Sequence, residues 1–318
     1  MIAEKFRLIT KGDFDGVTCG ILLNHLGLID RTVFVHPKDV ESGKFAVTSG
    51  DITAGLPYKA DVHMAFDHFS SASARDAENL KVDAGALSVA SVIYKHYGKD
   101  RFFSTHEDLL EAVDMGSSGK IATEDILYPT GWVLLGYLLD PRTGLEEYKK
   151  FRKSHDELMN HLIHECGHRS IWEILDLPDI EERLDLYFSC TEDHKAQILR
   201  CSSVLSNLIV TDTRAEKVVY PGNKFVTYAL FPECDVSLNV ASSSDGRRTV
   251  FAAGKSVLDR HCSLDVGGVM KKYGGGGHAG AGGCQVASAK ADECKADLIK
   301  ELQYGTFKNL LQGYFNYY

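Results

Sequence analysis

The segment that decides the fold is residues 5–28, which read KFRLITKGDFDGVTCGILLNHLGL. Residues 5–10 have the apolar and β-branched content of a strand. Residues 11–16 (KGDFDG) form an acidic loop, and residues 17–28 are an apolar stretch of helical length. A strand that passes through a short polar loop into an apolar helix indicates the first half of a βαβ unit.

Two further strand-like runs extend this pattern. Residues 32–35 begin soon after the first helix, and residues 62–66 (VHMAF) run directly into an Asp-His pair. Strands that alternate with helical segments predict a parallel sheet. Ligands of such sheets gather beyond the carboxyl ends of the strands. The polar residues that follow the expected strands are Asp13, Asp15, His36, Asp67 and His68.

The pattern changes in the second half of the chain, which indicates a second domain. Residues 105–177 are helical in character, with Gly167 as a stop for the segment 145–166. Residues 192–208 are interpreted as a connecting helix. Strand-like runs separated by turn signals follow at 224–231, 236–242 and 249–254. We therefore predict a first domain at 1–190, a connection at 191–212 and a second domain at 213–318.

Length and composition are those of a folded protein with about two domains. The chain has 318 residues and a formal net charge of −9, which disfavours broad wrapping of duplex nucleic acid but permits a short oligonucleotide at a local site. Its longest apolar stretch, 131–139, is less than half of the roughly 20 residues that a membrane span needs. Eight scattered cysteines without a CxxC pair, and no secretion signal, predict reduced thiols in a cytoplasmic protein that does not enter a membrane.

Carboxylates form the first candidate site. Asp13 and Asp15 stand two positions apart, so both can face one side of an extended loop and serve neighbouring metal ions. Oxygen-rich ligation with some imidazole suits Mn²⁺ or Mg²⁺. A helix cap is the alternative explanation. Asp51 is expected to start a turn or helix and Asp114 to end a helical run, and each alone is equally consistent with a cap or an exposed charge.

A glycine run forms the second candidate site. Residues 273–283 read YGGGGHAGAGG. Because four consecutive glycines lack Cβ atoms, their amides can approach anionic oxygens closely, and His278 then projects from an uncrowded loop. A flexible loop is the alternative. The strand-like residues 284–286 that follow, and the alternation of Gly with Ala, favour close packing.

Together these motifs resemble the DHH phosphoesterase family with its DHH-associated C-terminal domain. The resemblance covers nearly the whole chain. The segments HPKD (36–39), GWVLL (131–135) and DPRTGL (140–145) are similar to the exopolyphosphatase-related, nanoRNase-like group. The motifs that carry the family resemblance are GDFDG (12–16), Asp51, FDHF (66–69), Asp114 and GGGGHAGAGG (274–283). The resemblance implies a parallel-sheet α/β domain and a smaller α/β domain, with a cleft between them.

The resemblance also implies a function. It is that of a hydrolase, a Mn²⁺- or Mg²⁺-dependent phosphoesterase that uses an activated water to cleave a short single-stranded oligonucleotide, a nucleotide or a polyphosphate-type substrate. The implied metal ligands are Asp15, Asp51, His68 and Asp114 at one site, and Asp13 with Asp51 at a second. The implied catalytic residues are Asp15, Asp67, His68 and His278. The implied substrate-binding residues are Gly275, Gly276, Gly277 and His278. Arg142 is a further candidate because a guanidinium can bind two phosphate oxygens, with an exposed loop arginine as the alternative, and His36 is a candidate because it lies near the expected cleft.

Two positions depart from the family pattern. Ile9 stands where the first motif usually has a metal-binding histidine, and Phe69 replaces the second histidine of Asp-His-His. Neither side chain can bind a metal or donate a proton to a phosphate oxygen. We therefore expect one firm metal site and one weak site. The alternative is a catalytically degenerate member that binds a nucleotide without cleaving it.

Two other features allow different interpretations. Residues 164–168 (HECGH) match the HExxH pattern of zinc proteases, although Gly167 sits at an expected helix end, where a polar helix terminus is the plainer explanation. The aromatic tail 310–318 either covers the core of the second domain or forms a contact in a homodimer.

Overall fold

The computed structural model describes residues 5–68, 77–103, 105–258 and 262–315. The chain divides into two units. The first comprises Met1–Lys120 and Tyr128–Ser189, and the second comprises Ile121–Leu127 and Cys190–Tyr318. Across the described ranges, no helix combines the length and the apolar character that a membrane crossing requires.

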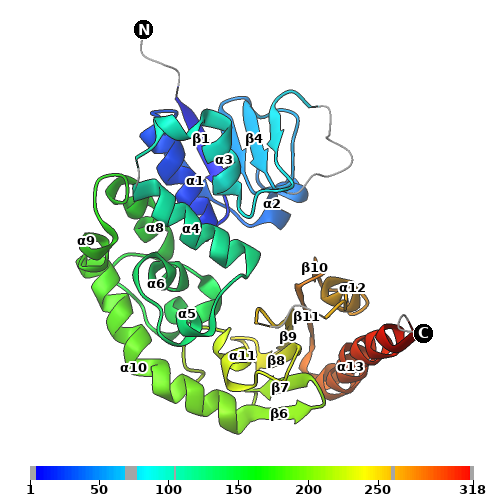
Figure 1. The fold of residues 1–318 in the computed structure, drawn as a ribbon. Coiled ribbons are helices and arrows are strands. Elements are labelled where there is room, and N and C mark those ends of the chain that lie inside the picture. The colour runs from blue at the N-terminus through cyan, green and yellow to red at the C-terminus, as the bar shows by residue number, and fades with distance from the viewer. Residues whose placement is uncertain (1–4, 69–76, 104, 259–261, 316–318) are drawn as a thin grey trace. The chain divides into compact units, whose positions relative to one another are not determined.

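The first unit is built on a parallel five-stranded sheet in the order β2-β1-β3-β4-β5. Figure 1 labels β1 and β4 of this sheet. Its strands are β1 (Phe6–Thr10), β2 (Ile29–Phe34), β3 (Asp51–Ala54), β4 (Met64–Asp67) and β5 (Leu80–Val82). The strand after β1 in sequence, β2, is added on one side of β1, and β3 is added on the other side, so the order in which strands join the sheet reverses at β1 while all strands stay parallel. A ligand crevice is expected outside the carboxyl ends of the strands at such a switch point.

Helices complete the first unit. Those between the strands and after them are α1 (Phe14–His25), α2 (Pro37–Glu41), α3 (Val89–Tyr97), α4 (Thr105–Ser118), α6 (Gly131–Leu138), α7 (Leu145–Tyr148), α8 (His155–Glu165) and α9 (Ile171–Leu175). Short 3₁₀ turns occupy Lys99–Arg101 and Pro141–Thr143. The long helix α10 (Pro178–Cys201) begins in the first unit and ends in the second.

The second unit contains a mixed six-stranded sheet in the order β10-β11-β9-β8-β7-β6, with β7 and β8 parallel and the other neighbours antiparallel. Its strands are β6 (Ser202–Leu205), β7 (Leu208–Asp212), β8 (Val236–Ser242), β9 (Arg248–Lys255), β10 (Gly276–His278) and β11 (Ala281–Ala287). Its helices are α5 (Thr123–Leu127), α11 (Val226–Leu230), α12 (Val266–Lys271) and α13 (Ala291–Phe315), with a 3₁₀ turn at Ser288–Lys290. Both sheets confirm the predicted mixed α/β class.

Most of the predicted strands are confirmed, while three local expectations are wrong. The segment 224–231 contains a helix, α11, because the Asn223 side chain accepts the Phe225 amide and the buried Tyr228 hydroxyl donates to the Gly254 carbonyl. Asp51 begins strand β3 and not a turn or helix. Asp114 lies within α4, four residues before its end.

Helix boundaries also differ from the expected ones. The first helix begins at Phe14, ahead of the expected residue 17, because the Asp13 carboxylate accepts the Gly16 amide at 2.9 Å and caps it. The expected connecting helix at 192–208 is the end of α10, which gives way to β6. The stop at Gly167 is confirmed, since α8 ends at Glu165. Phe69 and residues 316–318 of the aromatic tail lie outside the described residues.

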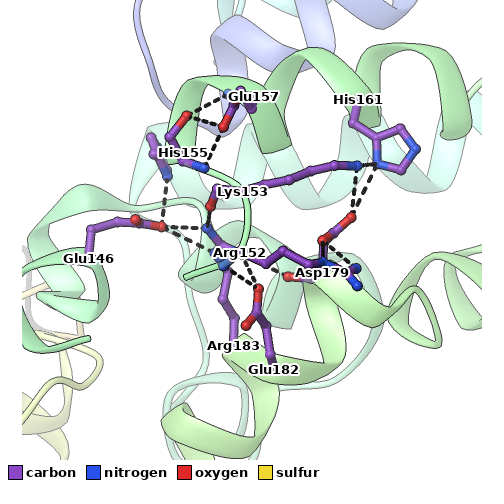
Figure 2. Close-up of polar contacts among 10 residues, drawn as sticks. Glu146, Arg152, Lys153, His155, Glu157, His161, Asp179, Glu182 and Arg183 are labelled. Atoms are coloured by element: carbon purple, nitrogen blue, oxygen red, sulfur yellow. Dashed lines mark hydrogen bonds and ion pairs between the residues drawn. The ribbon is translucent and has the colours of Figure 1, made fainter. Parts of the chain in front are cut away.

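A buried arginine joins the later helices of the first unit (Figure 2). The Arg183 side chain is fully buried and donates to Glu146 Oε1 at 2.7 Å, to the Asp179 carbonyl at 2.8 Å and to the Lys153 carbonyl at 2.7 Å. Its guanidinium also lies 4.1 Å from the centre of the Phe151 ring. These contacts hold α7 and the loop before α8 against α10.

Arg183→Met is expected to destabilise the protein by about 3–5 kcal/mol, because it removes the ion pair with Glu146 and the buried hydrogen bonds to the carbonyls of Asp179 and Lys153. Arg152→Met removes the same charge from an exposed side chain that pairs with Asp179, so it is the matched control and should have a much smaller effect. Urea unfolding curves of both variants measure the difference. Equal midpoints for the two variants would contradict this account.

Candidate active site at the carboxyl edge of the parallel sheet

Asp13 and Asp15 lie just beyond the carboxyl end of β1, at the switch point of the sheet. Asp15 is buried and accepts hydrogen bonds from the amides of Val89 at 3.1 Å and Ala90 at 2.9 Å. Burial is the main cause that raises the pKa of Asp15, and the charge of Asp13 adds to it, while Lys11 and the two amides oppose it. A buried carboxylate with a raised pKa and a like charge beside it favours the binding of a cation.

Asp114, from helix α4, contacts the amino end of α3, the helix whose first two amides bind Asp15. Its carboxylate accepts hydrogen bonds from the hydroxyls of Ser88 at 2.5 Å and Ser91 at 2.8 Å. Ser88 is also the N-cap of α3 and accepts the Ser91 amide. The amino end of α3 therefore brings Asp15 and Asp114 to one place, through its backbone amides and its serine hydroxyls.

Two cations lie close to Asp13. The Lys11 ammonium is 3.2 Å from Asp13 Oδ2. Burial would lower the pKa of Lys11, but the charges of Asp13 and Asp15 outweigh it and raise that pKa. Arg142 forms a bidentate pair with Asp140, and the charge of Asp13 is among the causes that raise the Arg142 pKa. Arg142, a candidate phosphate contact from the sequence, therefore lies within electrostatic range of the acidic loop.

Asp67 and His68 stand at the carboxyl end of β4, on the same edge of the sheet. Asp67 is the last residue of β4, its Oδ1 accepts the His68 amide at 2.8 Å, and it lies 3.8 Å from His68 Nδ1. His36 follows β2 and caps α2, since its Nδ1 accepts the Lys38 amide at 3.2 Å. Asp67 therefore ends its strand, and His68 and His36 follow theirs, at the edge of the sheet that the sequence predicted.

Asp51 is the one predicted ligand that lies at the wrong edge. It pairs in register with Arg7 of β1, six residues before Asp13, so it sits at the amino end of the sheet. Its carboxylate accepts two hydrogen bonds from Arg7, at 2.6 and 2.8 Å, and one from the Thr48 amide at 2.7 Å. Burial would raise the pKa of Asp51, but these bonds outweigh it and lower it. The expectation that Asp51 shares a metal site with Asp13 and Asp15 is corrected.

The donors that remain fit a divalent cation by their chemistry. Carboxylate oxygens at the edge of the sheet are ligands that Mn²⁺ and Mg²⁺ prefer, and Asp15 is a buried carboxylate whose environment favours an added positive charge. Within the described ranges, however, no three His, Cys, Asp or Glu side chains are gathered closely enough to hold a metal ion. The residues therefore fit a divalent cation in the type of their donor atoms and in their place at the edge of the sheet, but they do not form a closed set of ligands.

The glycine run of the second unit forms a tight hairpin in place of a flexible loop. Gly276, Gly277 and His278 of β10 pair with β11. Gly277 has φ +149°, and a Cβ atom there would clash with the Ala281 carbonyl and Gly282. His278 is exposed, and its Nδ1 accepts the Gly280 amide at 3.1 Å, which leaves Nε2 to carry the proton of the neutral ring.

The HExxH match does not form the helix that a zinc protease needs. Helix α8 ends at Glu165, so His168 lies beyond it. Glu165 is engaged by Arg169 at 2.5 Å and lies 3.5 Å from His161, and the Arg169 hydrogen bond lowers its pKa. The polar helix end, which was the plainer explanation, describes what is observed.

Three residues near the acids were missed from sequence: Lys11, Ser88 and Ser91. Lys11 belongs to the same KGDFDG loop as the acids, and its charge was the available signal. Ser88 precedes the mostly apolar segment 89–94 (VASVIY), which is the pattern of a helix N-cap. That signal predicts the start of α3 but not that Asp15 and Asp114 converge on it.

The chain is similar to proteins of known structure. It matches no protein-family model and no curated protein. Among solved structures, it is similar to the pGpG-specific phosphodiesterase PggH from Vibrio cholerae, with 42% identity, a TM-score of 0.83, and coverage of 95% of this chain and 100% of that one.

More distant structures share the fold. An exopolyphosphatase-related protein from Bacteroides fragilis has 11% identity and a TM-score of 0.52, and the match covers 96% of this chain and 94% of that one. RecJ from Thermus thermophilus, in complex with Mn²⁺, has 15% identity and a TM-score of 0.52, and the match covers 94% of this chain and 52% of that one.

Proposed function

Because the chain belongs to the DHH phosphoesterase family of hydrolases, we propose that it is a phosphodiesterase which cleaves a short oligonucleotide, with the dinucleotide pGpG as the first substrate to test. The observation that carries this proposal is the full-length similarity, at 42% identity, to a phosphodiesterase specific for pGpG. The acidic edge of the parallel sheet supports it, since Asp13, Asp15 and Asp114 lie where such a sheet binds its ligand.

The degenerate alternative, in which the chain binds a nucleotide without cleaving it, has no support. Its basis was that Ile9 and Phe69 replace expected histidines. However, the solved structure that is similar over the full length of this chain, at 42% identity, is that of a phosphodiesterase. Ile9 is fully buried in β1, where it packs with Val40 and Leu56. It therefore has a role in the core that is independent of the chemistry.

We propose that a divalent cation, Mn²⁺ or Mg²⁺, is held by Asp13 and Asp15 with help from His68 and Asp114. Such a cation polarises the phosphoryl group and lowers the pKa of the attacking water. Asp67 orients His68 from 3.8 Å. In the second unit, the amides of Gly275–Gly277 and His278 bind phosphate oxygens. His36 and Arg142 are further proposed contacts for the substrate, Arg142 through its planar guanidinium.

The test is hydrolysis by the purified full-length chain with Mn²⁺ or Mg²⁺. We expect pGpG to be converted to GMP, because cleavage of its one internal phosphodiester gives two mononucleotides. The comparison panel is pApA, a longer single-stranded RNA, cyclic di-GMP and inorganic polyphosphate. Product analysis by chromatography measures each rate. Failure to cleave pGpG, or faster release of phosphate from polyphosphate, would contradict the proposal.

The remaining expectations stay predictions. The cytoplasmic location, the homodimer through the aromatic tail, and the domain limits 1–190, 191–212 and 213–318 rest on sequence alone. Gel filtration with light scattering would test the homodimer directly.

A further inference from the structure

The ligands expected at a second metal position are largely missing from this chain. Of the residues that the family resemblance assigns there, Asp51 lies at the opposite edge of the sheet, bound to Arg7. Ile9, which replaces the expected histidine, is buried in the core. Asp13 is the remaining carboxylate, and a divalent ion held by this carboxylate alone would need water or substrate oxygens for all its other ligands.

A lysine occupies the space beside that carboxylate. The Lys11 side chain leaves the end of β1 and extends across to the end of β3. Its Cε lies 3.1 Å, and its Nζ 3.7 Å, from the position that a Cβ atom of Gly55 would take. Gly55 directly follows β3 and donates its amide to the Phe66 carbonyl of β4. The ammonium therefore lies at the switch point between β1 and β3, where the sheet is expected to bind its ligand.

The absence of a side chain at Gly55 makes this position available. Its Cβ would also lie 3.3 Å from Val89 Cγ2, and its φ is +65°, which favours glycine. Val89 is the residue whose amide binds Asp15. Lys11 is thus packed between the strand end and the helix start that hold the acidic site, and its ammonium is 3.2 Å from Asp13 Oδ2.

We propose, on the basis of the phosphodiesterase function above, that the Lys11 ammonium takes the place of a second divalent ion, so that this chain works with one bound metal ion. The ammonium supplies a fixed positive charge beside Asp13 and Asp15. In that position it also attracts a phosphate oxygen of the substrate. Asp51 is turned away to Arg7 and position 9 is an isoleucine, so the positive charge that the second metal ion would supply comes from Lys11.

The test begins with metal stoichiometry, which needs no turnover. Equilibrium dialysis of the full-length protein against Mn²⁺ is expected to give one bound ion per chain. The electron paramagnetic resonance spectrum is expected to be that of an isolated ion. Two bound ions per chain, or a spectrum of coupled ions, would overturn the inference.

The second part is a charge series at Lys11, assayed with pGpG. Lys11→Met is expected to lower kcat by about 30-fold, as for the loss of one charge-assisted contact. Lys11→Arg should recover most of this loss, which a purely structural role would not predict. Lys95→Met removes an exposed lysine that pairs with Asp83, and it is the matched control with wild-type kcat. A Lys11→Met variant with wild-type kcat would overturn the inference.

Folding and function are kept apart in this design. Thermal unfolding checks each variant, and Lys11→Gln is the second neutral variant in the event that Lys11→Met does not fold. If wild-type protein cleaves pGpG but binds two ions, the phosphodiesterase function stands and the role of Lys11 fails. If it binds one ion but does not cleave pGpG, the proposed substrate fails and the stoichiometry still supports Lys11.

Discussion

Asp15→Asn is expected to lower kcat for pGpG by about 1,000-fold, because it removes a buried negative charge from the place where a cation must bind. The asparagine fits the same space and keeps one acceptor for the amides of Val89 and Ala90. The fold should therefore persist while hydrolysis is lost. Steady-state kinetics at saturating Mn²⁺ measure this change.

The same variant should alter how stability depends on pH. Because burial raises the folded-state pKa of Asp15 above its unfolded value, folding favours the protonated form. That stabilising contribution is present below the unfolded pKa of about 3.9 and is lost as the pH rises through the raised value. The melting temperature of Asp15→Asn relative to wild type should therefore be more favourable at pH 8 than at pH 4.

Asp108 provides the control for both measurements. It is exposed near the start of α4, so Asp108→Asn removes the same charge from the first unit without touching the acidic loop. Its kcat and its pH dependence of stability should follow those of the wild type. An Asp15→Asn variant that kept a tenth or more of the wild-type kcat would remove Asp15 from the chemistry.

The first strand and helix of the first unit were predictable from sequence, because secondary structure there depends on residues that are close together along the chain. The run from residue 5 to 28 carries a strand, a capping aspartate and an apolar helix, and these became β1 and α1. The segment 224–231 shows where such reasoning fails. A short apolar run is compatible with a strand or a buried helix, and here the hydrogen bond from the Phe225 amide to the Asn223 side chain and the burial of Tyr228 favour the helix.

The candidate site was predictable only in part, because its geometry depends on contacts that are distant in sequence. The positions of Asp13, Asp15 and Asp67 follow from the rule for strand ends. Asp51 was misplaced because a motif position does not reveal register, and β3 pairs so that Asp51 lies beside Arg7. The convergence of Asp114 with Asp15 required the serines at the start of α3, which are separated from both acids by long stretches of chain.

Gly277→Ala is expected to lower kcat/KM for pGpG by about 100-fold, since displacement of a binding loop by about 1 Å has effects of this size. A methyl group at this position would clash with the Ala281 carbonyl and Gly282, so β10 could not pair with β11 as observed. The acids of the first unit are untouched. The loss should therefore appear mainly in KM, with kcat at saturating substrate close to that of the wild type.

Gly276 offers a comparison within the same hairpin. No atom lies within 4 Å of the position that its Cβ would take, so Gly276→Ala should leave the pairing of β10 with β11 intact. Its effect on KM should be much smaller than that of Gly277→Ala, although the two residues are adjacent and equally small. Equal effects would mean that the methyl group acts by blocking the substrate and not by displacing the hairpin. An unchanged KM in both variants would show that the glycine run does not bind the substrate, and the proposed phosphate contacts would then have to come from the first unit alone, with Arg142 among them.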